Sequence, residues 1–293
     1  MDLCSPSVLK PLLERYGFSF SKSLGQNFLI DGRVPEKIAE HCAPQSISEE
    51  SLPSVLEIGP GAGALTAALA KRYPAVCALE LDERLFPLLA EALAEFSNVK
   101  IVQGDVLKTD LKALVRDNLP VGKVVAAANL PYYITTPAIK ALLSPRVFAR
   151  VTVMVQKEVA AKLTSQPGEP DWCLFSLIVS YYSRPIRLFP VPAGAFFPRP
   201  KVDSAVVAFD PKPPLLPPET ENLFFRLATA AFAQRRKTLS NALSAAFGKH
   251  FAAELFSSCK INPNLRGEAL FLEDFLQLAV ISAEILEKNN GAG

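Results

Sequence analysis

The sequence predicts an α/β protein with one mostly parallel sheet of seven strands, followed by a small all-helical domain. The sheet is predicted because, from Val55 onward, short apolar runs alternate with helix-length amphipathic segments, the pattern of parallel strands joined by helices. The second domain is predicted because five prolines within residues 211–218 precede segments with helical spacing and few strand formers. Such a proline-rich stretch is stiff and typical of a domain boundary.

Seven apolar runs are expected to form the strands, and the segments between them are expected to be helical. The strands are predicted at residues 55–58, 76–81, 99–103, 124–128, 151–156, 186–190 and 205–209. The helices are predicted at residues 65–72, 83–96, 111–118, 137–143 and 174–182. Two further helices are predicted at residues 8–16 and 34–42, and the polar stretch 19–27 between them is expected to be an arm that a ligand orders.

The proline-rich stretch divides the chain into a catalytic domain, residues 1–210, and a helical domain, residues 211–293. Within the helical domain, helices are predicted at residues 222–233, 237–247, 251–256 and 270–286. The last five residues, 289–293, are expected to fray.

Composition indicates a globular protein, with 49% hydrophobic and 20% charged residues among 293. No apolar run approaches the roughly 18 residues of a membrane helix, and the first residues lack an export or import pattern, so a cytoplasmic location is expected. The five cysteines are scattered without a C-x-x-C pair, and there are only two histidines. Neither a metal site nor a disulfide is therefore expected.

Charge is unevenly distributed along the chain. Residues 36–95 carry 4 basic and 10 acidic side chains, a net charge of −6, whereas residues 108–201 carry 13 basic and 5 acidic ones, a net charge of +8. The acidic part fits a small cationic cofactor and the basic part fits a polyanion such as RNA. The alternative is a pair of ordinary solvated surfaces of unequal charge.

The first predicted strand runs into a glycine motif that indicates a nucleotide-like ligand, with the sequence EIGPGAG at residues 57–63. The spacing is G-x-G-x-G, which differs from the G-x-G-x-x-G of dinucleotide sites. Glu57 would also place an anion beside a pyrophosphate. Because Glu57 suits a cationic ligand, S-adenosyl-L-methionine, with its ammonium and sulfonium groups, is favoured over a dinucleotide.

Polar side chains follow the next three predicted strands at the same edge of the sheet. Glu80 is placed to accept the ribose hydroxyl hydrogens, and Asp105 to accept the exocyclic amine of the cofactor's adenine. Asn129 ends the fourth strand. Each carboxylate alone could instead be a helix cap or a surface residue, but together they predict one site.

Asn129, Leu130, Pro131 and Tyr132 could activate an exocyclic amine of a nucleobase, whose lone pair is delocalised into the ring. The Asn129 side-chain oxygen and the Leu130 carbonyl could accept the two amine hydrogens and direct the nitrogen towards a methyl donor. Pro131 holds Leu130 extended, and Tyr132 offers a face on which a splayed base could stack. Taken alone, a four-residue match of this kind is more often an ordinary loop after a strand.

Eight longer stretches make the chain resemble the KsgA-type family of ribosomal RNA adenine dimethyltransferases over nearly its whole length. They are SKSLGQNFL at 21–29, LEIGPGAGALT at 56–66, ELD at 80–82, GDVL at 104–107, NLPYYITTP at 129–137, QKEVAAKL at 156–163, FFPRPKVDSAVV at 196–207 and FAQRRKTLSNAL at 232–243. The resemblance implies a Rossmann-like S-adenosylmethionine-dependent methyltransferase sheet. It also implies transfer of two methyl groups to N6 of each of two adjacent adenines near the 3′ end of small-subunit (16S) ribosomal RNA, in an assembling 30S-type subunit.

Motif and resemblance together define three expected groups of site residues. The cofactor-binding group is Gln26, Asn27, Leu29, Glu57, Gly59, Gly61, Gly63, Glu80, Leu81, Asp105, Val106 and Asn129. The catalytic group is Asn129, Leu130, Pro131, Tyr132 and Phe196. Phe196 begins the F-x-P-x-P motif, so it is preferred to Phe197 as the aromatic ring that faces Tyr132 across the target base. The alternative is that both phenylalanines belong to the core. The RNA-binding group is Arg199, Lys201, Arg235, Arg236 and Lys237, for which a solvated face is the alternative.

Three other functions compete with small-subunit dimethylation. An Erm-type enzyme would modify large-subunit RNA, but the 22–29 and 196–204 stretches resemble the KsgA type more closely. A ribosome assembly factor would act mainly by binding, with methylation secondary. A DNA adenine methyltransferase would share the element at 129–132, but the small helical domain and the lack of a target-recognition insert argue against it. A monomer that binds neither membrane nor metal is expected.

Overall fold

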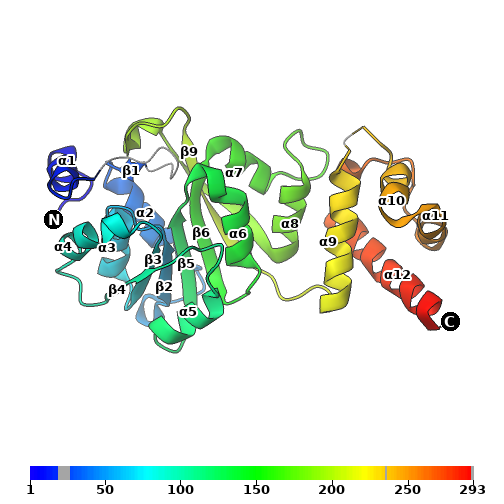
Figure 1. The fold of residues 1–293 in the computed structure, drawn as a ribbon, viewed down its shortest axis with the longest axis horizontal. Helices are drawn as coiled ribbons and strands as arrows, with labels where there is room; N and C mark the ends of the chain where they lie inside the picture. Colours follow the sequence, from blue (N-terminus) through cyan, green and yellow to red (C-terminus); the bar gives the residue numbers. More distant parts are fainter. Residues whose placement is uncertain (19–26, 235, 292–293) are drawn as a thin grey trace. The chain divides into compact units, whose positions relative to one another are not determined.

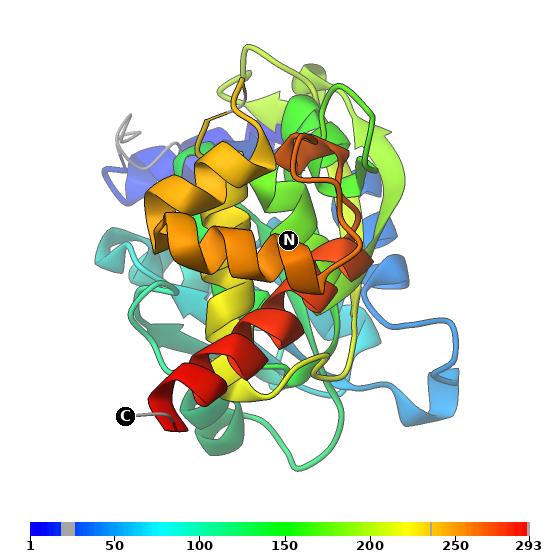
Figure 2. The same cartoon turned by 90° about the vertical axis from the view of Figure 1, so that its right-hand side faces the viewer.

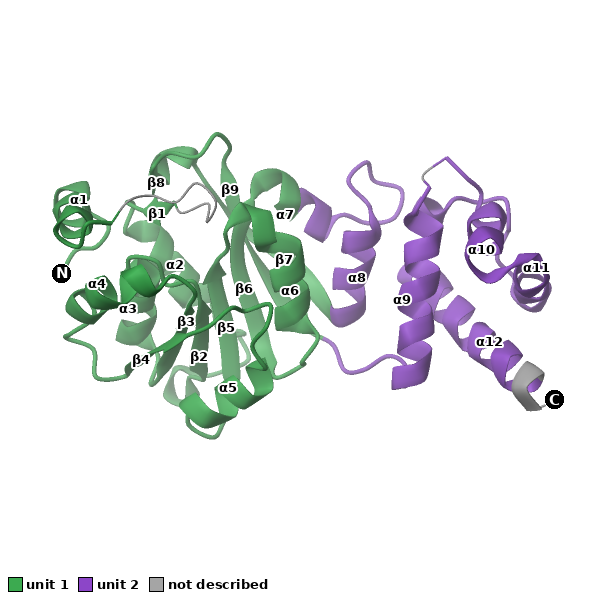
Figure 3. Ribbon diagram, in the orientation of Figure 1, with its two compact units in different colours: residues 1–160, 183–211 green, residues 161–182, 212–293 purple. Residues whose placement is uncertain are grey.

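A computed structural model describes residues 1–18, 27–234 and 236–291 of the chain (Figure 1). The chain forms two compact units (Figure 3). The first comprises Met1–Ala160 and Ser183–Pro211, and the second comprises Ala161–Tyr182 and Lys212–Gly293. None of the described helices is long and apolar enough to span a membrane.

The first unit contains the seven-stranded sheet, in the order β4-β3-β2-β5-β6-β9-β7. Five strands are parallel: β2 (Ser54–Ile58), β3 (Val76–Glu80), β4 (Val99–Gln103), β5 (Val124–Asn129) and β6 (Phe148–Gln156). Strand β9 (Ser204–Pro211) is antiparallel to β6 and to β7 (Ser183–Val191). All seven strands predicted from the apolar runs are present in one mostly parallel sheet, and the predicted Rossmann-like fold class is confirmed.

The sequence forms these strands because both faces of the central ones are covered. Every residue of β2 and β3 is buried, which explains why their sequences are continuous apolar runs rather than alternating ones. One apolar cluster packs Ile38 and Leu69 against Val55, Val125 and other strand residues. This packing holds the carboxyl ends of the strands in fixed relative positions.

Helices connect and flank the strands of the first unit (Figure 1). They are α1 (Pro6–Arg15), α2 (Arg33–His41), α3 (Ala64–Arg72), α4 (Phe86–Ala92), α5 (Leu111–Asn118) and α6 (Thr135–Leu143), with α7 (Lys157–Thr164) crossing from one unit to the other. Asp110 caps α5 by accepting hydrogen bonds from the amides of Lys112 and Ala113. The single helix predicted at 83–96 is instead a short 3-10 turn, η3 (Glu83–Leu85), followed by α4, in which Pro87 occupies the first turn.

The first helix, α1, belongs to the core of the first unit. Leu9, Leu12 and Leu13 lie in a second apolar cluster with residues of η3 and α4, such as Leu88. Arg15 Nη1 donates a hydrogen bond of 2.6 Å to Glu91 Oε1, and the Tyr16 hydroxyl donates one of 2.7 Å to Glu91 Oε2. These two hydrogen bonds hold the C-terminal end of α1 against α4.

A two-stranded ribbon was not predicted from the sequence. Strand β1 (Phe28–Leu29) pairs antiparallel with β8 (Phe196–Phe197), so that Leu29 lies opposite Phe196. The Ile30 amide extends the pairing by donating a hydrogen bond of 2.8 Å to the Ala195 carbonyl. Each strand is too short to give a periodic signal, and the partners lie far apart in the sequence.

The described part of the second unit is helical. It contains α8 (Leu174–Tyr182), α9 (Pro218–Phe232), α10 (Leu239–Phe247), α11 (Lys249–Ser258) and α12 (Leu272–Gly291). Helix α9 packs against α12, and α10 packs against α11 (Figure 2, yellow to red). An aromatic core holds the unit together, with Tyr181 stacked on Phe224 at 4.5 Å between ring centroids and Phe232 stacked on Phe275 at 5.9 Å.

Helix α8 groups with the helical unit, although the boundary predicted at residues 210 and 211 places it in the catalytic domain. The reason is aromatic packing, because Tyr181 and Tyr182 of α8 pack on Phe225 of α9 as well as on each other. The proline-rich stretch does coincide with the second crossing from one unit to the other, after Pro211. The first crossing, within α7, has no proline or glycine to mark it.

Candidate active site

A pocket lies in the first unit where the loops after β2, β3, β4 and β5 meet the β1–β8 ribbon. In a parallel α/β sheet, this carboxyl edge of the strands is where ligands bind. The structure brings together most of the residues predicted from the sequence in the lining of this one pocket: Asn27, Leu29, Glu57, Gly59, Gly61, Glu80, Leu81, Asp105, Val106, Asn129, Leu130, Pro131, Tyr132 and Phe196.

The glycine loop after β2 needs backbone angles that other residues rarely adopt. Gly59, Gly61 and Gly63 have φ angles of 69°, 59° and 88°, in the left-handed region that glycine enters without steric cost. A Cβ on Gly61 would also lie 3.1 Å from the Phe28 ring. Gly63 is not among the lining residues: it is the N-cap of α3, where a Cβ would lie 3.3 Å from Leu89.

Glu57 is a buried carboxyl in the pocket wall. It is 1% exposed, and no described residue donates a hydrogen bond to its Oε2. Burial raises the pKa of Glu57 to about 8, the neighbouring Thr66 hydroxyl lowers it in part, and the negative charge of Glu80 raises it further. A cationic ligand in the pocket would favour the ionised form of this carboxyl.

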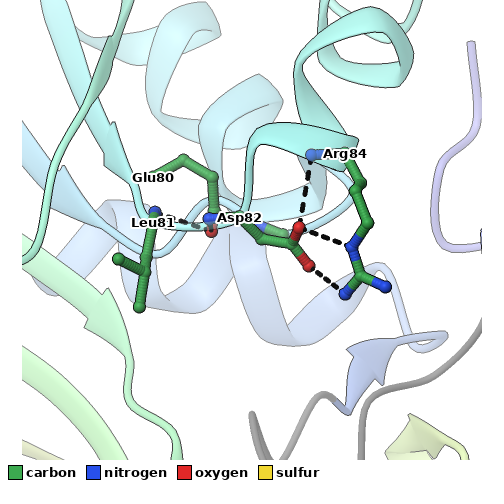
Figure 4. Close-up of polar contacts among 5 residues, drawn as sticks. Glu80, Leu81, Asp82 and Arg84 are labelled. Atoms are coloured by element: carbon green, nitrogen blue, oxygen red, sulfur yellow. Dashed lines mark hydrogen bonds and ion pairs between the residues drawn. The ribbon is translucent and has the colours of Figure 1, made fainter.

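Glu80 is held in one orientation by backbone amides at the end of β3. Its Oε1 accepts hydrogen bonds of 2.9 Å from the amides of Leu81 and Asp82 (Figure 4), and its Oε2 accepts one of 3.2 Å from the Gly61 amide. Burial raises the pKa of Glu80, although these hydrogen bonds lower it in part. These hydrogen bonds connect the glycine loop after β2 to the end of β3, and the Glu80 carboxylate lines the pocket beside them.

Asp82 follows Glu80 and carries a bidentate ion pair. Arg84 Nε and Nη2 donate hydrogen bonds of 2.8 and 2.6 Å to the two carboxylate oxygens of Asp82 (Figure 4). The guanidinium also lies 5.3 Å from the centre of the Phe18 ring. These contacts connect the loop after β3 to the end of the N-terminal helical region.

The loop after β4 presents Asp105, which lies two residues beyond the strand. Its Oδ1 accepts a hydrogen bond of 2.9 Å from the Leu107 amide, and its Oδ2 lies 3.8 Å from Lys108 Nζ. Val106 lines the pocket from a buried position, whereas Leu81 lines it while 50% exposed. The pocket therefore combines carboxylates with apolar surface at this end.

At the end of β5, the turn that begins with Asn129 is held by hydrogen bonds. Asn129 Nδ2 donates one of 3.4 Å to the Asn27 carbonyl, which fixes the orientation of the amide. The Leu130 amide donates one of 3.3 Å to the Met154 carbonyl. The Thr135 hydroxyl donates to the Pro131 and Tyr132 carbonyls, and the Ile134 amide donates to the Pro131 carbonyl. Neither of these two groups donates to the Leu130 carbonyl.

Tyr132 and Phe196 both line the pocket, from the turn after β5 and from β8. The Tyr132 hydroxyl lies 3.0 Å from the Ser204 hydroxyl, and burial raises the pKa of Tyr132. Phe196 is 3% exposed and is fixed by the pairing of β8 with β1. The predicted aromatic clamp residues thus share one pocket with Asn129.

The four described residues of the predicted RNA-binding group are exposed, two in each unit. Arg199 and Lys201 are exposed in the segment between β8 and β9. Arg236 and Lys237 are exposed just before α10 of the helical unit. Gln26 of the cofactor-binding group and Arg235 of the RNA-binding group lie outside the described residues.

Several lining residues were missed, among them Phe28, Asp82, Leu85, Tyr133 and Ile134. Asp82, Tyr133 and Ile134 lie within the ELD and NLPYYITTP stretches, and proximity to a predicted site residue could have found them. Phe28 lies between the predicted Asn27 and Leu29 and could have been found in the same way. Leu85 gives no such signal, because its apolar side chain cannot be told from a core residue by sequence alone. Within the described ranges, no group of three or more His, Cys, Asp and Glu side chains could hold a metal ion.

Two solved structures are similar to this chain in fold. A dimethyladenosine transferase from Plasmodium falciparum has a TM-score of 0.67 at 24% identity and covers 86% of this chain and 95% of that one. The 23S rRNA methyltransferase ErmE has a TM-score of 0.65 at 23% identity, with 87% and 99% covered. At these identities the similarity shows the fold alone.

Sequence comparison is more specific. The family model described as Ribosomal RNA adenine dimethylase matches residues 17–284. A protein of Bacillus mycoides (strain KBAB4), called Ribosomal RNA small subunit methyltransferase A, is 42% identical over 98% of this chain and 99% of the relative. A protein of the same description from Alkaliphilus oremlandii (strain OhILAs) is 42% identical over 94% and 96%. With a family model matched over most of its length and relatives of this identity aligned end to end, the chain belongs to the ribosomal RNA adenine dimethylase family.

Proposed function

We propose that this protein transfers methyl groups from S-adenosyl-L-methionine to N6 of two adjacent adenines in the 3′-terminal hairpin of small-subunit (16S) ribosomal RNA. The product is N6,N6-dimethyladenine, formed during assembly of the small subunit. The observation that carries the proposal is that one pocket holds both the three carboxylates suited to the cofactor and the turn from Asn129 to Tyr132. Family membership and the descriptions of the two bacterial relatives support the same reaction and substrate.

The carboxylates provide the proposed cofactor site. Glu57 would face the ammonium group, Glu80 would accept hydrogen bonds from the ribose hydroxyls, and Asp105 would accept one from the adenine amine. Bound S-adenosylmethionine supplies a methyl group activated by the positive sulfonium. The buried Oε2 of Glu57, to which no described residue donates a hydrogen bond, supports a cationic ligand here.

The turn after β5 would activate the target amine. The Asn129 side-chain oxygen and the Leu130 carbonyl would accept its two hydrogens, which directs the nitrogen lone pair towards the methyl donor. The hydrogen bond from Asn129 Nδ2 to the Asn27 carbonyl supports this role, because it fixes the amide before the substrate arrives. The methylated nitrogen is acidic and can lose its proton to solvent, so catalysis needs positioning and charge arrangement rather than a strong base.

The target adenine would be held between Tyr132 and Phe196, since an enzyme acting on N6 must take the base out of its stack. Arg199 and Lys201 lie a few residues beyond Phe196 and would meet the RNA phosphates next to the flipped base. In the helical unit, Arg236 and Lys237, together with Arg235, would make additional contacts with RNA. Phosphate contacts of this kind supply affinity, whereas the pocket supplies the choice of base.

The proposal is tested by incubating the purified protein with labelled S-adenosylmethionine and three substrates: undermethylated small subunits, protein-free large-subunit RNA and duplex DNA. Incorporation into the small subunits alone is expected. Incorporation into large-subunit RNA in its place would show an Erm-type activity, and incorporation into DNA would show a DNA adenine methyltransferase. Either result would overturn the proposed substrate.

A further inference from the structure

The Tyr132 residue is held at two points by hydroxyl side chains. At its backbone, the Thr135 hydroxyl donates a hydrogen bond of 3.2 Å to the Tyr132 carbonyl. At the far end of the ring, the phenol oxygen lies 3.0 Å from Ser204 Oγ. The two contacts involve opposite ends of the residue, so both its backbone and its ring are restrained.

Ser204 is a rigid anchor because of its place in the sheet. It begins β9, where it lies opposite Gln156 of β6 and Val191 of β7, and its side chain is fully buried. A strand paired on both sides cannot shift without breaking both ladders. Serine also has a single side-chain torsion to the hydroxyl, so its position is set by the strand.

The hydroxyl contact restricts the position of the Tyr132 ring. The long axis of a tyrosine ring is set by the first side-chain torsion, and a hydrogen bond at the phenol oxygen, which lies at the far end of that axis, limits this torsion. Rotation of the ring about the axis leaves the oxygen in place, so the contact fixes where the ring lies. An aromatic ring whose position is already fixed loses less conformational freedom when a base stacks on it. The same hydrogen bond also satisfies the phenol group of a half-buried ring.

We infer that Ser204 is a positioning residue for methyl transfer, which holds the Tyr132 ring as a pre-set wall for the target adenine. The inference rests on the proposed function, in which Tyr132 stacks on that base. Ser204 itself does not line the pocket. Its effect should therefore reach the RNA substrate only through Tyr132, and cofactor binding should not depend on it.

The test is a double-mutant cycle with Ser204→Ala, Tyr132→Phe and the combined variant. Tyr132→Phe keeps the stacking face and removes only the hydroxyl, so it reports on the hydrogen bond even if Ser204→Ala lowers stability. Each single change should lower kcat/KM on undermethylated small subunits by roughly fivefold, the typical effect of losing one hydrogen bond. The combined variant should lose no more than either single variant, because both remove the same contact.

Ser183→Ala is the matched control, because Ser183 is another fully buried serine of the same sheet. It begins β7 and lies opposite Pro211, at the other end of β9 from Ser204. We expect it to leave kcat/KM unchanged. Thermal unfolding and the dissociation constant for S-adenosylmethionine are measured for all four variants. The dissociation constant should stay within twofold of the wild-type value.

Losses that multiply in the combined variant would overturn the inference, and so would an equal loss in Ser183→Ala or an unchanged kcat/KM in Tyr132→Phe. With an active wild-type enzyme, each of these results overturns the role of Ser204 alone. A wild-type protein that does not methylate small subunits would overturn the proposed function, and the role of Ser204 with it.

Discussion

Glu57 is the most deeply buried of the pocket carboxyls, at 1% exposed, and burial raises its pKa to about 8 from an ordinary value of 4.5. Between these two values the unfolded chain is ionised at this position, whereas the folded protein keeps the proton. The folded state therefore binds more protons, and the free energy of unfolding falls as the pH rises. The contribution of the neutral carboxyl is fully present below pH 4.5 and is lost as the pH rises through about 8.

Glu57→Gln should remove this pH dependence. In the ligand-free wild-type protein, the free energy of unfolding should decrease between pH 5 and pH 8 with a slope of up to about 1.4 kcal/mol per pH unit from this group. The variant should lack that component and be more stable than the wild type at pH 8. Urea unfolding at pH 5, 6, 7 and 8 measures the difference, with the exposed Glu40→Gln of α2 as the control. Parallel pH profiles for wild type and Glu57→Gln would contradict the assignment.

Single residues of the pocket were predictable where position and chemistry coincided. Glu80, Asp105 and Asn129 were identified because parallel strands end at one edge of a sheet, so polar residues just after them converge. Phe28 was not identified, although it lies between the predicted Asn27 and Leu29, because its apolar side chain lines the pocket only through the pairing of β1 with β8. The sequence also could not separate Gly61, which lines the pocket, from Gly63, which lets α3 begin close to Leu89.

At the scale of elements, the loop between β2 and α3 depends on glycine at position 61. Gly61→Ala would place a Cβ against Phe28 and force a left-handed conformation on alanine, which costs about 1 kcal/mol or more. We expect roughly tenfold weaker binding of S-adenosylmethionine, from this strain and a displaced Phe28, and a lower melting temperature. Calorimetric titration and thermal unfolding check both.

Gly32→Ala provides the comparison, because Gly32 has a helical φ of −60° and a Cβ there would lie 3.7 Å from Cys4, an ordinary contact. It should leave cofactor binding unchanged and should not lower stability. Equal effects of the two substitutions would show that the geometry of the glycine loop is not the cause.

One ion pair connects two strands of the sheet with the segment after α2. Arg150 of β6 donates hydrogen bonds of 2.7 and 3.0 Å to the carboxylate of Asp210 in β9, and its Nη1 lies 3.4 Å from the carbonyls of His41 and Ala43. The Arg150 side chain is only 10% exposed. The pair therefore lies in an environment where an unpartnered charge is costly.

Arg150→Ala should lower the free energy of unfolding by about 3 kcal/mol, because it leaves Asp210 without its main partner in a partly buried site. Chemical denaturation measures the change. Arg116→Ala is the control, since Arg116 is 74% exposed and pairs with the exposed Asp117, and it should leave stability nearly unchanged. A loss below about 1 kcal/mol for Arg150→Ala would contradict a structural role for the pair.

The main elements were predictable because their signals are local. The strands appear as apolar runs, and α5 and α8 have the predicted bounds. Two features were not predictable: the β1–β8 ribbon and the membership of α8 in the helical unit. Both depend on partners that are distant in sequence. A single helix was expected at 83–96, but Pro87 is favoured only in the first turn of a helix, so a 3-10 turn precedes the shorter α4.

At the scale of the whole molecule, the proposal assigns base selection to the first unit and additional RNA contacts to the second. Arg236 and Lys237 are exposed before α10, so reversing both charges should weaken binding to small subunits. The slope of log affinity against log salt concentration should fall by about 2, one for each lost phosphate contact. Filter binding from 50 to 300 mM salt measures the slope.

A double charge reversal away from this cluster, Lys249→Glu at the start of α11 with Lys260→Glu just after its end, is the matched control for net charge in the same unit. It should change the salt dependence less than the reversal at Arg236 and Lys237 does. Unchanged affinity and slope in the Arg236→Glu, Lys237→Glu variant would mean that this face of the helical unit is an ordinary solvated surface.

The chemistry proposed for Asn129 also separates methylation from a role in assembly. Asn129→Ala should keep subunit binding, because the amide lies in the pocket and the basic residues remain. If a strain that carries this variant matured its small subunits fully, binding would be the function that assembly needs, and methylation would be secondary.

The most direct measurement maps methyl groups on undermethylated small subunits after reaction with the wild-type protein or with Asn129→Ala. For the wild type we expect N6,N6-dimethyladenine at two adjacent adenines near the 3′ end of the small-subunit RNA. For Asn129→Ala we expect turnover to fall by about 100-fold or more, the scale of losing a group that orients the reacting atoms, with a much smaller change in the dissociation constant for S-adenosylmethionine. Dimethyladenine absent from that site with the wild type, or normal turnover in Asn129→Ala, would contradict the account.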